Sequence, residues 1–461
     1  MTPQETVERA LGLSKADGCI VVTTERSEAN LRWAGNTLTT NGSMRSRKVA
    51  VISVVDGATG TAAGVVERSA VTGDGLEELV RASEQAARDA GPADDAAPLV
   101  EPTDAADNWE AGPEETSIDV FGQVAPALGE AFGRAAAAQR LLFGFAEHVL
   151  ETRYVGSSTG VRRRWVQPTG RIDVNGKSPD FGRSAWVGRS TRDFADIDIA
   201  ALDAELAERL GWAARSVELP PGRYETILPP TSVADLMFYL YVSAGARDAD
   251  DGRTVFSKAG GGTRIGERLS STPITLRSNP AEPGLEAEPF VTATASFGGL
   301  QSVFDNGHPV TPTDWIRSGE LAELIRTRAW AARTDARPAP MADNLILEVP
   351  DATAGLPDMI ARTERGLLLT CLWYIREVDP QTLLLTGLTR DGVYLVEGGE
   401  VTGAVNNFRW NESPVDLLGR LTEVGRTERC LPREWSDYFT RTAMPALRVP
   451  DFNMSTVSQA S

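Results

Sequence analysis

The second half of the chain is a succession of short apolar runs separated by Gly, Asn and Pro, and this pattern restricts the possible folds more than any other feature. From Gly222 onward, FVTATASF, LLLTCLWYI and TLLLTGLTRDGVYLVEGGEV are rich in residues that favour strands and are bounded by turn residues. One strong helical pattern, which begins near Thr231, lies among them. We therefore predict a large strand-rich domain over residues 221–461.

The first half alternates helical and strand patterns and predicts two smaller α/β units, residues 1–95 and 117–220. Between them, residues 96–116 are rich in Pro, Ala and acids, which is typical of a linker. Within the first unit, ANLRWAGNTLTTNG predicts a bent strand or a hairpin at Gly35-Asn36. The complete chain is predicted to be α+β, because strands and helices do not alternate regularly along it. Helices are expected over Thr6–Leu13, Gly75–Asp89, Ile118–Ala138 and Ile199–Ser216.

The charge and the N-terminus limit where the protein works and what it binds. The net charge is −18, and no basic stripe is present to release phosphate counterions, which disfavours direct nucleic-acid binding. The N-terminal MTPQETVERALGL lacks the basic start and apolar run of a signal peptide. No segment reaches the roughly 18 to 20 consecutive apolar residues of a membrane span. We expect a cytoplasmic protein that does not contact a membrane.

The helix near the middle of the chain, within TSVADLMFYLYVSAGAR, has an unusually apolar surface. Thr231 is predicted to cap it, with the first turn at Val233. Apolar residues recur at helical spacing, and Asp235 is the single acid. The helix contains no His and no Cys, so it offers none of the soft ligands of a tight zinc site.

The histidines and cysteines do not form a recognisable catalytic set. The two histidines are distant: His148 is in an alternating strand and His308 is in a turn, and both are interpreted as structural. Cys371 is in an apolar strand and is predicted to be core. Cys430 follows RTER, and the neighbouring arginines Arg426 and Arg429 could lower its thiol pKa, although a surface or half-buried thiol without a role is the simpler interpretation.

The segment SKAGGGTRIGERL is the most Gly-rich part of the chain. It lacks the G-x-x-x-x-G-K-[ST] pattern of a P-loop. Its backbone N–H groups could cradle an anion, and a flexible loop after the central helix is the alternative.

Three stretches in order along the chain resemble the TldD/PmbA family, also called the modulator-of-DNA-gyrase family. They are ANLRWAGNTLTTNG with the strands and the GLEELVRASEQAARDA helix that follow, the central helix with RDADDGRTVFSKAGGGTRIGERLSSTPITL, and DGVYLVEGGEVTGAVNNFRWNESPVDLL. The resemblance covers essentially the whole chain. It implies the family's fold and a role in a cytosolic heterodimeric metallopeptidase that trims unfolded or leader peptides.

The resemblance also implies which of the two subunits this chain is. In the family, the TldD-type chain carries His-Glu, three residues and His on the central helix, and a distant Cys completes its zinc site. Here the interval from Ser232 to Ala244 holds none of these residues, and Cys430 alone falls about where the Cys ligand would be. The chain therefore resembles the PmbA/TldE-type subunit: it is expected to bind no cofactor itself, to use zinc held by its TldD-type partner, and to have no catalytic residue.

An extended peptide can be gripped by adding as a strand to a sheet edge. In the Gly-rich loop, Arg264 and Glu267 are candidate polar contacts with the peptide or the partner. In NNFRWNESP, Asn407, Arg409 and Asn411 occupy alternating positions, so they are predicted to share one strand face. An ordinary role in turn and strand structure is the alternative for all five.

Two other functions remain open at this stage. The chain could be a self-sufficient homodimeric peptidase that uses Cys430 and His308. It could also be a peptide-binding or regulatory module without a peptidase role, which would bind peptide without hydrolysis even beside a TldD-type chain.

Overall fold

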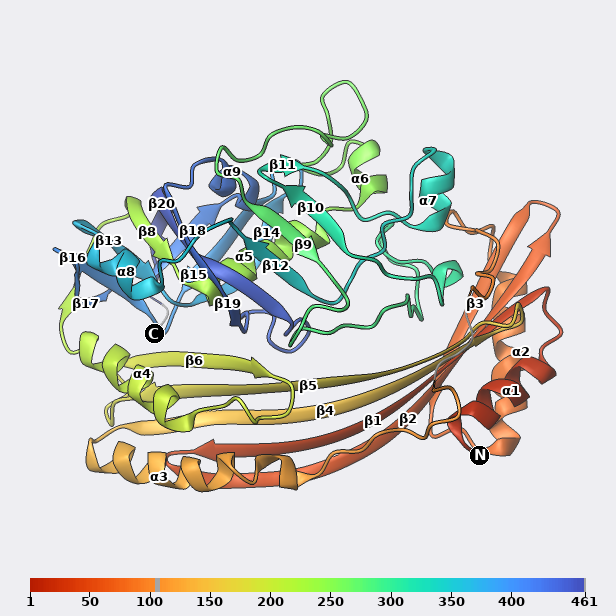
Figure 1. Cartoon of the computed structure of the whole chain (residues 1–461), viewed down its shortest axis with the longest axis horizontal. Helices are drawn as coiled ribbons and strands as arrows, with labels where there is room; N and C mark the ends of the chain where they lie inside the picture. Colours follow the sequence, from red (N-terminus) through yellow and green to blue (C-terminus); the bar gives the residue numbers. More distant parts are fainter. Residues whose placement is uncertain (104–107, 460–461) are drawn as a thin grey trace.

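The computed structural model describes residues 1–103 and 108–459 and contains two large sheets (Figure 1). Residues 104–107 of the predicted linker and residues 460–461 lie outside this part of the chain. The first sheet is antiparallel throughout, in the order β3-β2-β1-β4-β5-β6. Its strands are β1 (Gly18–Ala34), β2 (Thr37–Gly57), β3 (Gly60–Ser69), β4 (Leu141–Ser157), β5 (Arg162–Lys177) and β6 (Ser184–Thr191).

Each of the two predicted smaller units contributes three strands to this one sheet. The pairing of β1 with β4 joins them, from Ile20 opposite Ser157 to Trp33 opposite Gly144. The described part of the expected linker packs on the sheet: the Trp109 ring meets the Tyr154 ring edge-on, with 5.7 Å between their centroids. The division of the first half at residues 96–116 stays a prediction.

The two faces of the first sheet have different partners, as the alternation of side chains along β1 requires. Odd-numbered residues such as Val21 and Leu31 pack under helices, whereas Ile20 and Val22 pack against Phe290 and its neighbours from the second half of the chain. The helices are α1 (Pro3–Leu13), α2 (Gly73–Asp89), the 3-10 turn η1 (Ile118–Phe121), α3 (Val124–Ala137) and α4 (Ile199–Trp212).

The predicted helices and the hairpin are confirmed with changed ends. The turn Gly35-Asn36 joins β1 to β2, and both residues have positive φ. α4 ends at Trp212 rather than Ser216, because the chain turns there into the short strand β7 (Ser216–Val217). The predicted helix over residues 118–138 is divided into η1 and α3.

The second sheet has fourteen strands and is mixed, which confirms the α+β class and the strand-rich second half. Most pairs are antiparallel, but β12 with β20, β13 with β8 and β17 with β7 are parallel. Besides β7, its strands are β8 (Gly222–Leu228), β9 (Thr275–Ser278), β10 (Thr313–Arg317), β11 (Glu320–Leu321), β12 (Leu345–Glu348), β13 (Arg365–Leu369), β14 (Leu372–Asp379), β15 (Leu384–Thr389), β16 (Val393–Glu397), β17 (Glu400–Val405), β18 (Phe408–Glu412), β19 (Glu423–Cys430) and β20 (Thr442–Val457).

Helix α5 packs against this sheet and forms the centre of the largest core. Smaller helices lie around the sheet (Figure 1). Helix α5 spans Pro230–Val242. The smaller helices are α6 (Ala246–Asp250), the 3-10 turn η2 (Val303–Asp305), α7 (Arg328–Arg333), α8 (Leu356–Ala361) and α9 (Pro414–Gly419). No helix of the described residues is long and apolar enough to cross a membrane.

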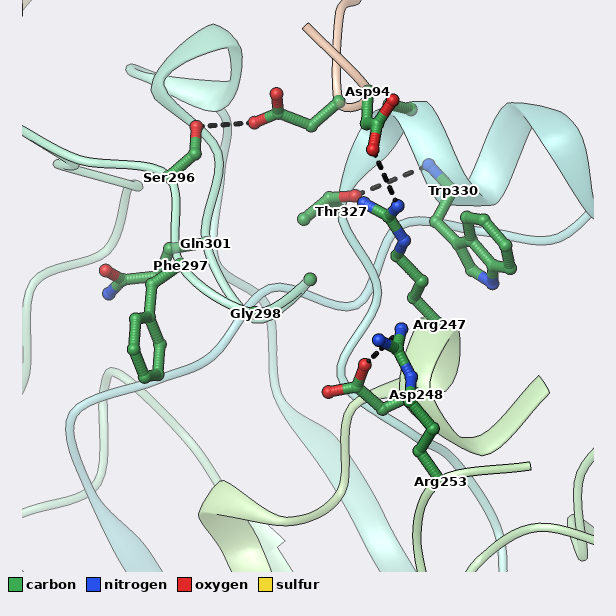
Figure 2. Close-up of a pocket in the computed structure, with 13 residues that line it drawn as sticks. Asp94, Arg247, Asp248, Arg253, Ser296, Phe297, Gly298, Gln301, Thr327 and Trp330 are labelled. Atoms are coloured by element: carbon green, nitrogen blue, oxygen red, sulfur yellow. Dashed lines mark hydrogen bonds and ion pairs between the residues drawn. The ribbon is translucent and has the colours of Figure 1, made fainter. Parts of the chain in front are cut away.

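The segment that follows α2 reaches across to the second half of the chain. Asp94 pairs with Arg247 at 3.0 Å, and Ser296 donates a hydrogen bond to Asp95. These contacts border a pocket of about 290 Å³, and Figure 2 shows Arg247 between Asp94 and the Trp330 ring. Charged groups of both signs line this pocket, and the Asp94–Arg247 ion pair and the Ser296–Asp95 hydrogen bond tie the two parts of the molecule together.

Candidate functional site

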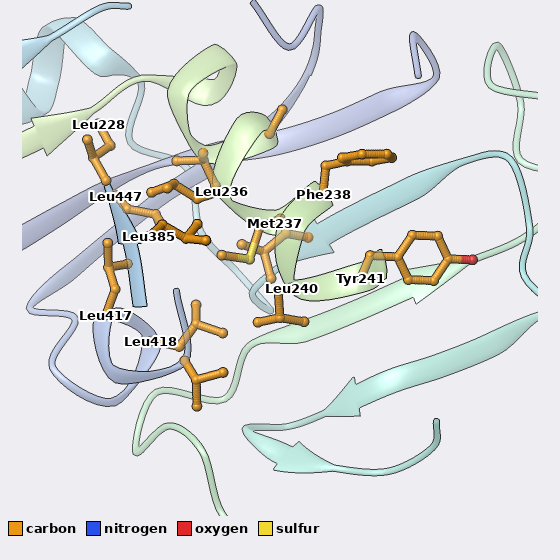
Figure 3. Close-up of a cluster of buried hydrophobic side chains, with 14 of the residues drawn as sticks. Leu228, Leu236, Met237, Phe238, Leu240, Tyr241, Leu385, Leu417, Leu418 and Leu447 are labelled. Atoms are coloured by element: carbon orange, nitrogen blue, oxygen red, sulfur yellow. The ribbon is translucent and has the colours of Figure 1, made fainter. Parts of the chain in front are cut away.

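Helix α5 is the place where the family resemblance would put zinc ligands, so its surroundings decide what chemistry is available. The helix starts after Pro229, and Pro230 occupies its first turn. Thr231 therefore lies inside the helix instead of capping it, because Pro at the first helical position already supplies the required φ. Most of its side chains are buried, and Figure 3 shows Leu236, Met237 and Leu240 within the apolar cluster.

Four polar side chains of α5, those of Ser232, Asp235, Tyr239 and Tyr241, form hydrogen bonds with neighbouring backbone. The Asp235 carboxylate accepts hydrogen bonds from the backbone N–H groups of Arg433 at 3.2 Å and Glu434 at 2.9 Å. Ser232 donates to the carbonyl of Leu369, and the Tyr239 hydroxyl donates to a carbonyl of β14. Burial raises the pKa of Asp235 well above its usual value, although these two N–H groups oppose the shift. The acid of α5 therefore fixes the segment that follows β19 and is not available as a ligand.

Cys430, at the end of β19, is fully packed. Its sulfur lies 3.3 Å from the Thr442 hydroxyl, and burial raises the pKa of its thiol to about 12. The predicted surface or half-buried position of Cys430 is therefore wrong, and neighbouring arginines do not lower its pKa. Arg426 pairs instead with Glu428 at 2.6 Å, and Arg429 with Asp196 at 2.5 Å. A protonated, buried thiol is neither a nucleophile nor a metal ligand at neutral pH.

Both histidines have structural surroundings. On β4, the His148 ring nitrogens contact the Thr116 hydroxyl at 2.6 Å and the Arg192 carbonyl at 2.9 Å. Burial lowers the pKa of His148, so a neutral ring is favoured. The backbone of His308 closes a turn by bonding to Asp305 and Val291, and burial lowers its pKa as well.

The residues around α5 do not fit a zinc ion. Within residues 1–103 and 108–459, no three His, Cys, Asp or Glu side chains come together in a way that could hold a metal ion. A structural or catalytic zinc site needs three or four deprotonated ligands at about 2.0–2.3 Å. Here Asp235 is occupied by backbone N–H groups, and the Cys430 thiol has a pKa of about 12.

A charged and aromatic junction, which the sequence did not indicate, joins the first residues of β6 and of β14 to the segment after β19. The Arg433 guanidinium lies over the rings of Trp186 and Trp373, at 4.9 and 4.4 Å from their centroids. Its Nε is buried without a hydrogen-bond partner, and an Asp391 oxygen lies 3.8 Å from the guanidinium. These residues are far apart in the sequence, so no local pattern could have shown their meeting.

Two adjoining clefts separate the first sheet from the second half of the chain. One, of about 310 Å³, is lined by Arg153 of β4 and by residues such as Met341 and Tyr438. The other, of about 270 Å³, is lined by β1, β2 and β4 and shares Arg153 and Thr292 with the first. Together they form a groove with polar and apolar walls. This arrangement suits an extended chain more than a compact small molecule.

Buried acids lie along this groove. Glu288 bonds Arg153 at 2.5 Å, and burial raises the pKa of the Glu288 carboxyl although Arg153 opposes the shift. Asp305 accepts a hydrogen bond from the backbone N–H of Arg328, while its Oδ1 has no hydrogen-bond partner. Burial raises the pKa of Asp305 to about 6.

The five predicted contact residues form two separate groups. Arg264 bonds Glu267 at 2.9 Å and also the Val255 carbonyl, so this pair braces the loop between α6 and β9. Arg409 and Asn411 lie on the outer face of β18, while the residues between and beside them are buried. Asn407 precedes β18 and accepts from the Thr389 hydroxyl at 3.2 Å. The structure does not bring the loop pair and the β18 group together in one described cleft.

Strand β18 lies between β15 and β20, so it is not an edge. A peptide could meet Arg409 or Asn411 only through side chains, because the backbone groups of an inner strand are already paired. The Oδ1 atom of Asn411 is buried without a hydrogen-bond partner.

Comparisons with known proteins identify the family of the chain and structures of similar fold. The family model described as PmbA/TldA metallopeptidase C-terminal domain matches residues 221–456, which is just over half of the chain. No curated protein matches.

Three solved structures resemble the fold over almost the whole chain. TldE from Thermococcus kodakarensis is 16% identical, with a TM-score of 0.78, and the match covers 98% of this chain and 99% of that one. A proposed modulator of a DNA gyrase from Thermotoga maritima is 16% identical, with a TM-score of 0.77 and coverage of 98% and 100%. A proposed modulator of DNA gyrase from Bacteroides thetaiotaomicron is 13% identical, with a TM-score of 0.74 and coverage of 98% and 99%.

Proposed function

The chain belongs to the PmbA/TldD metallopeptidase family, and we propose that it is the non-catalytic, PmbA/TldE-type subunit of a heterodimeric metallopeptidase. In this proposal, a homologous TldD-type chain holds the zinc ion and cleaves unfolded or leader peptides in the cytoplasm. This chain completes the complex and helps to hold the extended peptide.

The observation that carries the proposal is the state of the two groups nearest to the family's metal position. Asp235 is bonded to two backbone N–H groups, and the Cys430 thiol is buried with a pKa of about 12. Freeing Asp235 would require the segment after β19 to leave its place, and freeing Cys430 would require β19 to separate from Thr442 of β20. A homologous pair can keep one complete site and use the second chain for assembly, because the pseudo-symmetric interface does not depend on the metal.

The groove between the first sheet and the second half of the chain supports a peptide-holding role. Its walls combine the exposed Tyr438 ring and apolar side chains with charged groups such as Arg153 and Glu288. The same observation favours a second candidate function, a peptide-binding module that works without a peptidase. The two differ in whether a TldD-type chain is needed.

The test is to purify this chain and the TldD-type chain from the same source, separately and mixed. Size exclusion, zinc quantitation and cleavage of an unfolded peptide are measured for each sample. We expect co-elution, zinc in the partner, and cleavage in the mixture only. Stoichiometric zinc or cleavage with this chain alone would contradict the proposal, and peptide binding without co-elution or cleavage would favour the second candidate.

A matched set of variants tests the remaining alternative, a self-sufficient peptidase. His308→Ala and Cys430→Ser remove the two groups that such an enzyme would use. We expect both variants to keep the wild-type activity of the mixture, provided that their melting temperatures show folded protein. Loss of activity in a folded, co-eluting variant would favour the self-sufficient peptidase.

We also propose that the outer face of β18 and the loop between α6 and β9 contact the peptide or the partner. Arg409→Ala is expected to weaken peptide or partner binding about threefold to tenfold, which corresponds to about 0.7–1.4 kcal/mol. Arg317→Ala is the control, since Arg317 is an exposed arginine on β10. Equal affinity for both variants would remove Arg409 from the proposed surface.

A further inference from the structure

A cavity of about 560 Å³ lies where α4, from the first half of the chain, meets α8 and the hairpin of β16 and β17 from the second half (Figure 1). We call it the α4–α8 cavity. It is separate from the groove between the first sheet and the second half of the chain, because no residue lines both. Its volume is in the range of about 300–1,000 Å³ that is typical of small-molecule sites.

The inner surface of the α4–α8 cavity is apolar. Leu368 of β13 is fully buried and belongs to an apolar cluster, against which Ile360 of α8 and Val401 of β17 pack while they stay partly exposed. The Trp212 indole, at the end of α4, meets the Tyr394 ring edge-on, with 5.1 Å between the centroids. The cavity is therefore the open side of an apolar cluster, and one of its walls is an aromatic ring held in place by β16.

The charged groups at the α4–α8 cavity are mostly acidic. Glu205, Glu208, Arg209 and Glu400 line it. The Arg209 guanidinium donates to a backbone carbonyl of β6 and to Glu205, both at 2.5 Å, and Glu205 also binds Arg189 at 2.6 Å. Glu208 on α4 and Glu400 on β17 are exposed, and neither side chain has an ion pair or a hydrogen bond within residues 1–103 and 108–459. Two carboxylates on different walls thus remain without a cation.

We propose that the α4–α8 cavity binds a small organic cation in which an ammonium group is attached to an apolar ring. The ring packs on Leu368, Ile360 and Trp212, and the ammonium group lies between Glu208 and Glu400. A cation is also attracted to the face of an indole ring, whereas an anion of the same shape is repelled by both carboxylates. The inference does not depend on the proposed peptidase role, because it uses no residue of α5 or of the peptide groove.

The test compares three probes of similar shape on the purified chain by ligand-observed NMR titration. They are 2-phenylethylamine, 2-phenylethanol and phenylacetate, which are cationic, neutral and anionic at pH 7. We expect a dissociation constant of about 1 mM for the amine, because the probe is small and the two carboxylates are open to water. The alcohol should bind about fivefold more weakly, and phenylacetate should show no binding at about 20 mM.

A charge-removing double variant locates the site. Glu208→Gln combined with Glu400→Gln changes two exposed side chains, so the variant should fold. It should bind the amine about fivefold more weakly than the wild type does, and the alcohol with unchanged affinity. Glu101→Gln combined with Glu320→Gln is the control with the same net charge: both acids are exposed and neither lines the cavity, so it should bind the amine like the wild type.

A fourth probe distinguishes a small molecule from a lysine side chain of a peptide or partner protein. Nα-acetyl-lysine amide carries the same ammonium group on a flexible chain without a ring, and it should bind about fivefold more weakly than 2-phenylethylamine. Equal or tighter binding of this probe would overturn the proposed ligand class. The inference would also be overturned by an amine that does not bind at about 20 mM, by equal affinity for the amine and phenylacetate, or by unchanged amine affinity in the Glu208 and Glu400 double variant.

Discussion

Replacing Asp235 tests whether a buried acid of α5 holds the segment after β19 in place. In Asp235→Ala, the backbone N–H groups of Arg433 and Glu434 lose their acceptor, which lies at 3.2 and 2.9 Å in the native protein. A buried donor left without a partner costs about 1–3 kcal/mol, so the two together should cost about 3–5 kcal/mol. Asp235→Asn keeps one acceptor oxygen in a side chain of the same shape and should cost about 1–2 kcal/mol.

The assay is differential scanning calorimetry, which measures the melting temperature of each variant. A change of 1 kcal/mol shifts the melting temperature of a 150–250-residue unit by about 2–4 °C. We expect the alanine variant to melt about 10 °C lower and the asparagine variant about 4 °C lower. The exposed acid Glu218 provides the control, since Glu218→Ala should change stability by less than about 0.5 kcal/mol.

The result that would refute this reasoning is an alanine variant as stable as the asparagine variant. Asp235 would then not be the acceptor that holds the segment. The central argument for a non-catalytic subunit would lose its structural support, because an acid with no bound partner could serve as a ligand.

Three other outcomes follow from individual contacts. Gly64→Ala should destabilise the protein by at least about 3 kcal/mol, because the new methyl group would lie 2.1 Å from the backbone nitrogen of Ala87. Gly133→Ala, at an exposed position of α3, should instead stabilise the protein by about 0.5–1 kcal/mol. Urea unfolding measures both changes. The pKa of Asp305 is raised to about 6 in the folded protein, so its contribution to stability is greatest at low pH and is lost as pH rises from about 4 through 6. The stability of the wild type relative to Asp305→Asn should therefore fall by about 2 kcal/mol between pH 4 and pH 6, and equal pH profiles would contradict it. All three cysteines are buried, so a thiol reagent should modify none of them in the native chain and all three after denaturation; rapid native labelling would show that Cys430 is accessible.

The two parts of the functional proposal rest on different residues. The loss of zinc chemistry rests on α5 and β19, which are tied together in the core. The role in holding a peptide rests on the groove between the first sheet and the second half of the chain. Arg409 on β18 lines neither cleft of that groove, so variants of Asp235 and of Arg409 test the core contact and the proposed β18 contact separately.

Several features were determined by the sequence itself. Gly35-Asn36 between two alternating runs predicts the β1–β2 hairpin, because both residues tolerate positive φ. The apolar residues at helical spacing predict that α5 is buried. This helix contains no His and no Cys, so the sequence already excludes a His-containing zinc site on it. These are local properties of the chain, and local spacing reports them directly.

Other features were decided by the tertiary structure. The pairing of β1 with β4 makes one sheet of two predicted units, and strands so distant in the sequence are matched by packing and not by local pattern. Cys430 was expected to be a surface or half-buried thiol without a role, but β20 and its neighbours bury it and raise its pKa to about 12. The Arg433 junction likewise depends on which strands are neighbours. Burial and strand order are properties of the assembled core, and for this reason they fixed the chemistry of residues whose identities were already plain in the sequence.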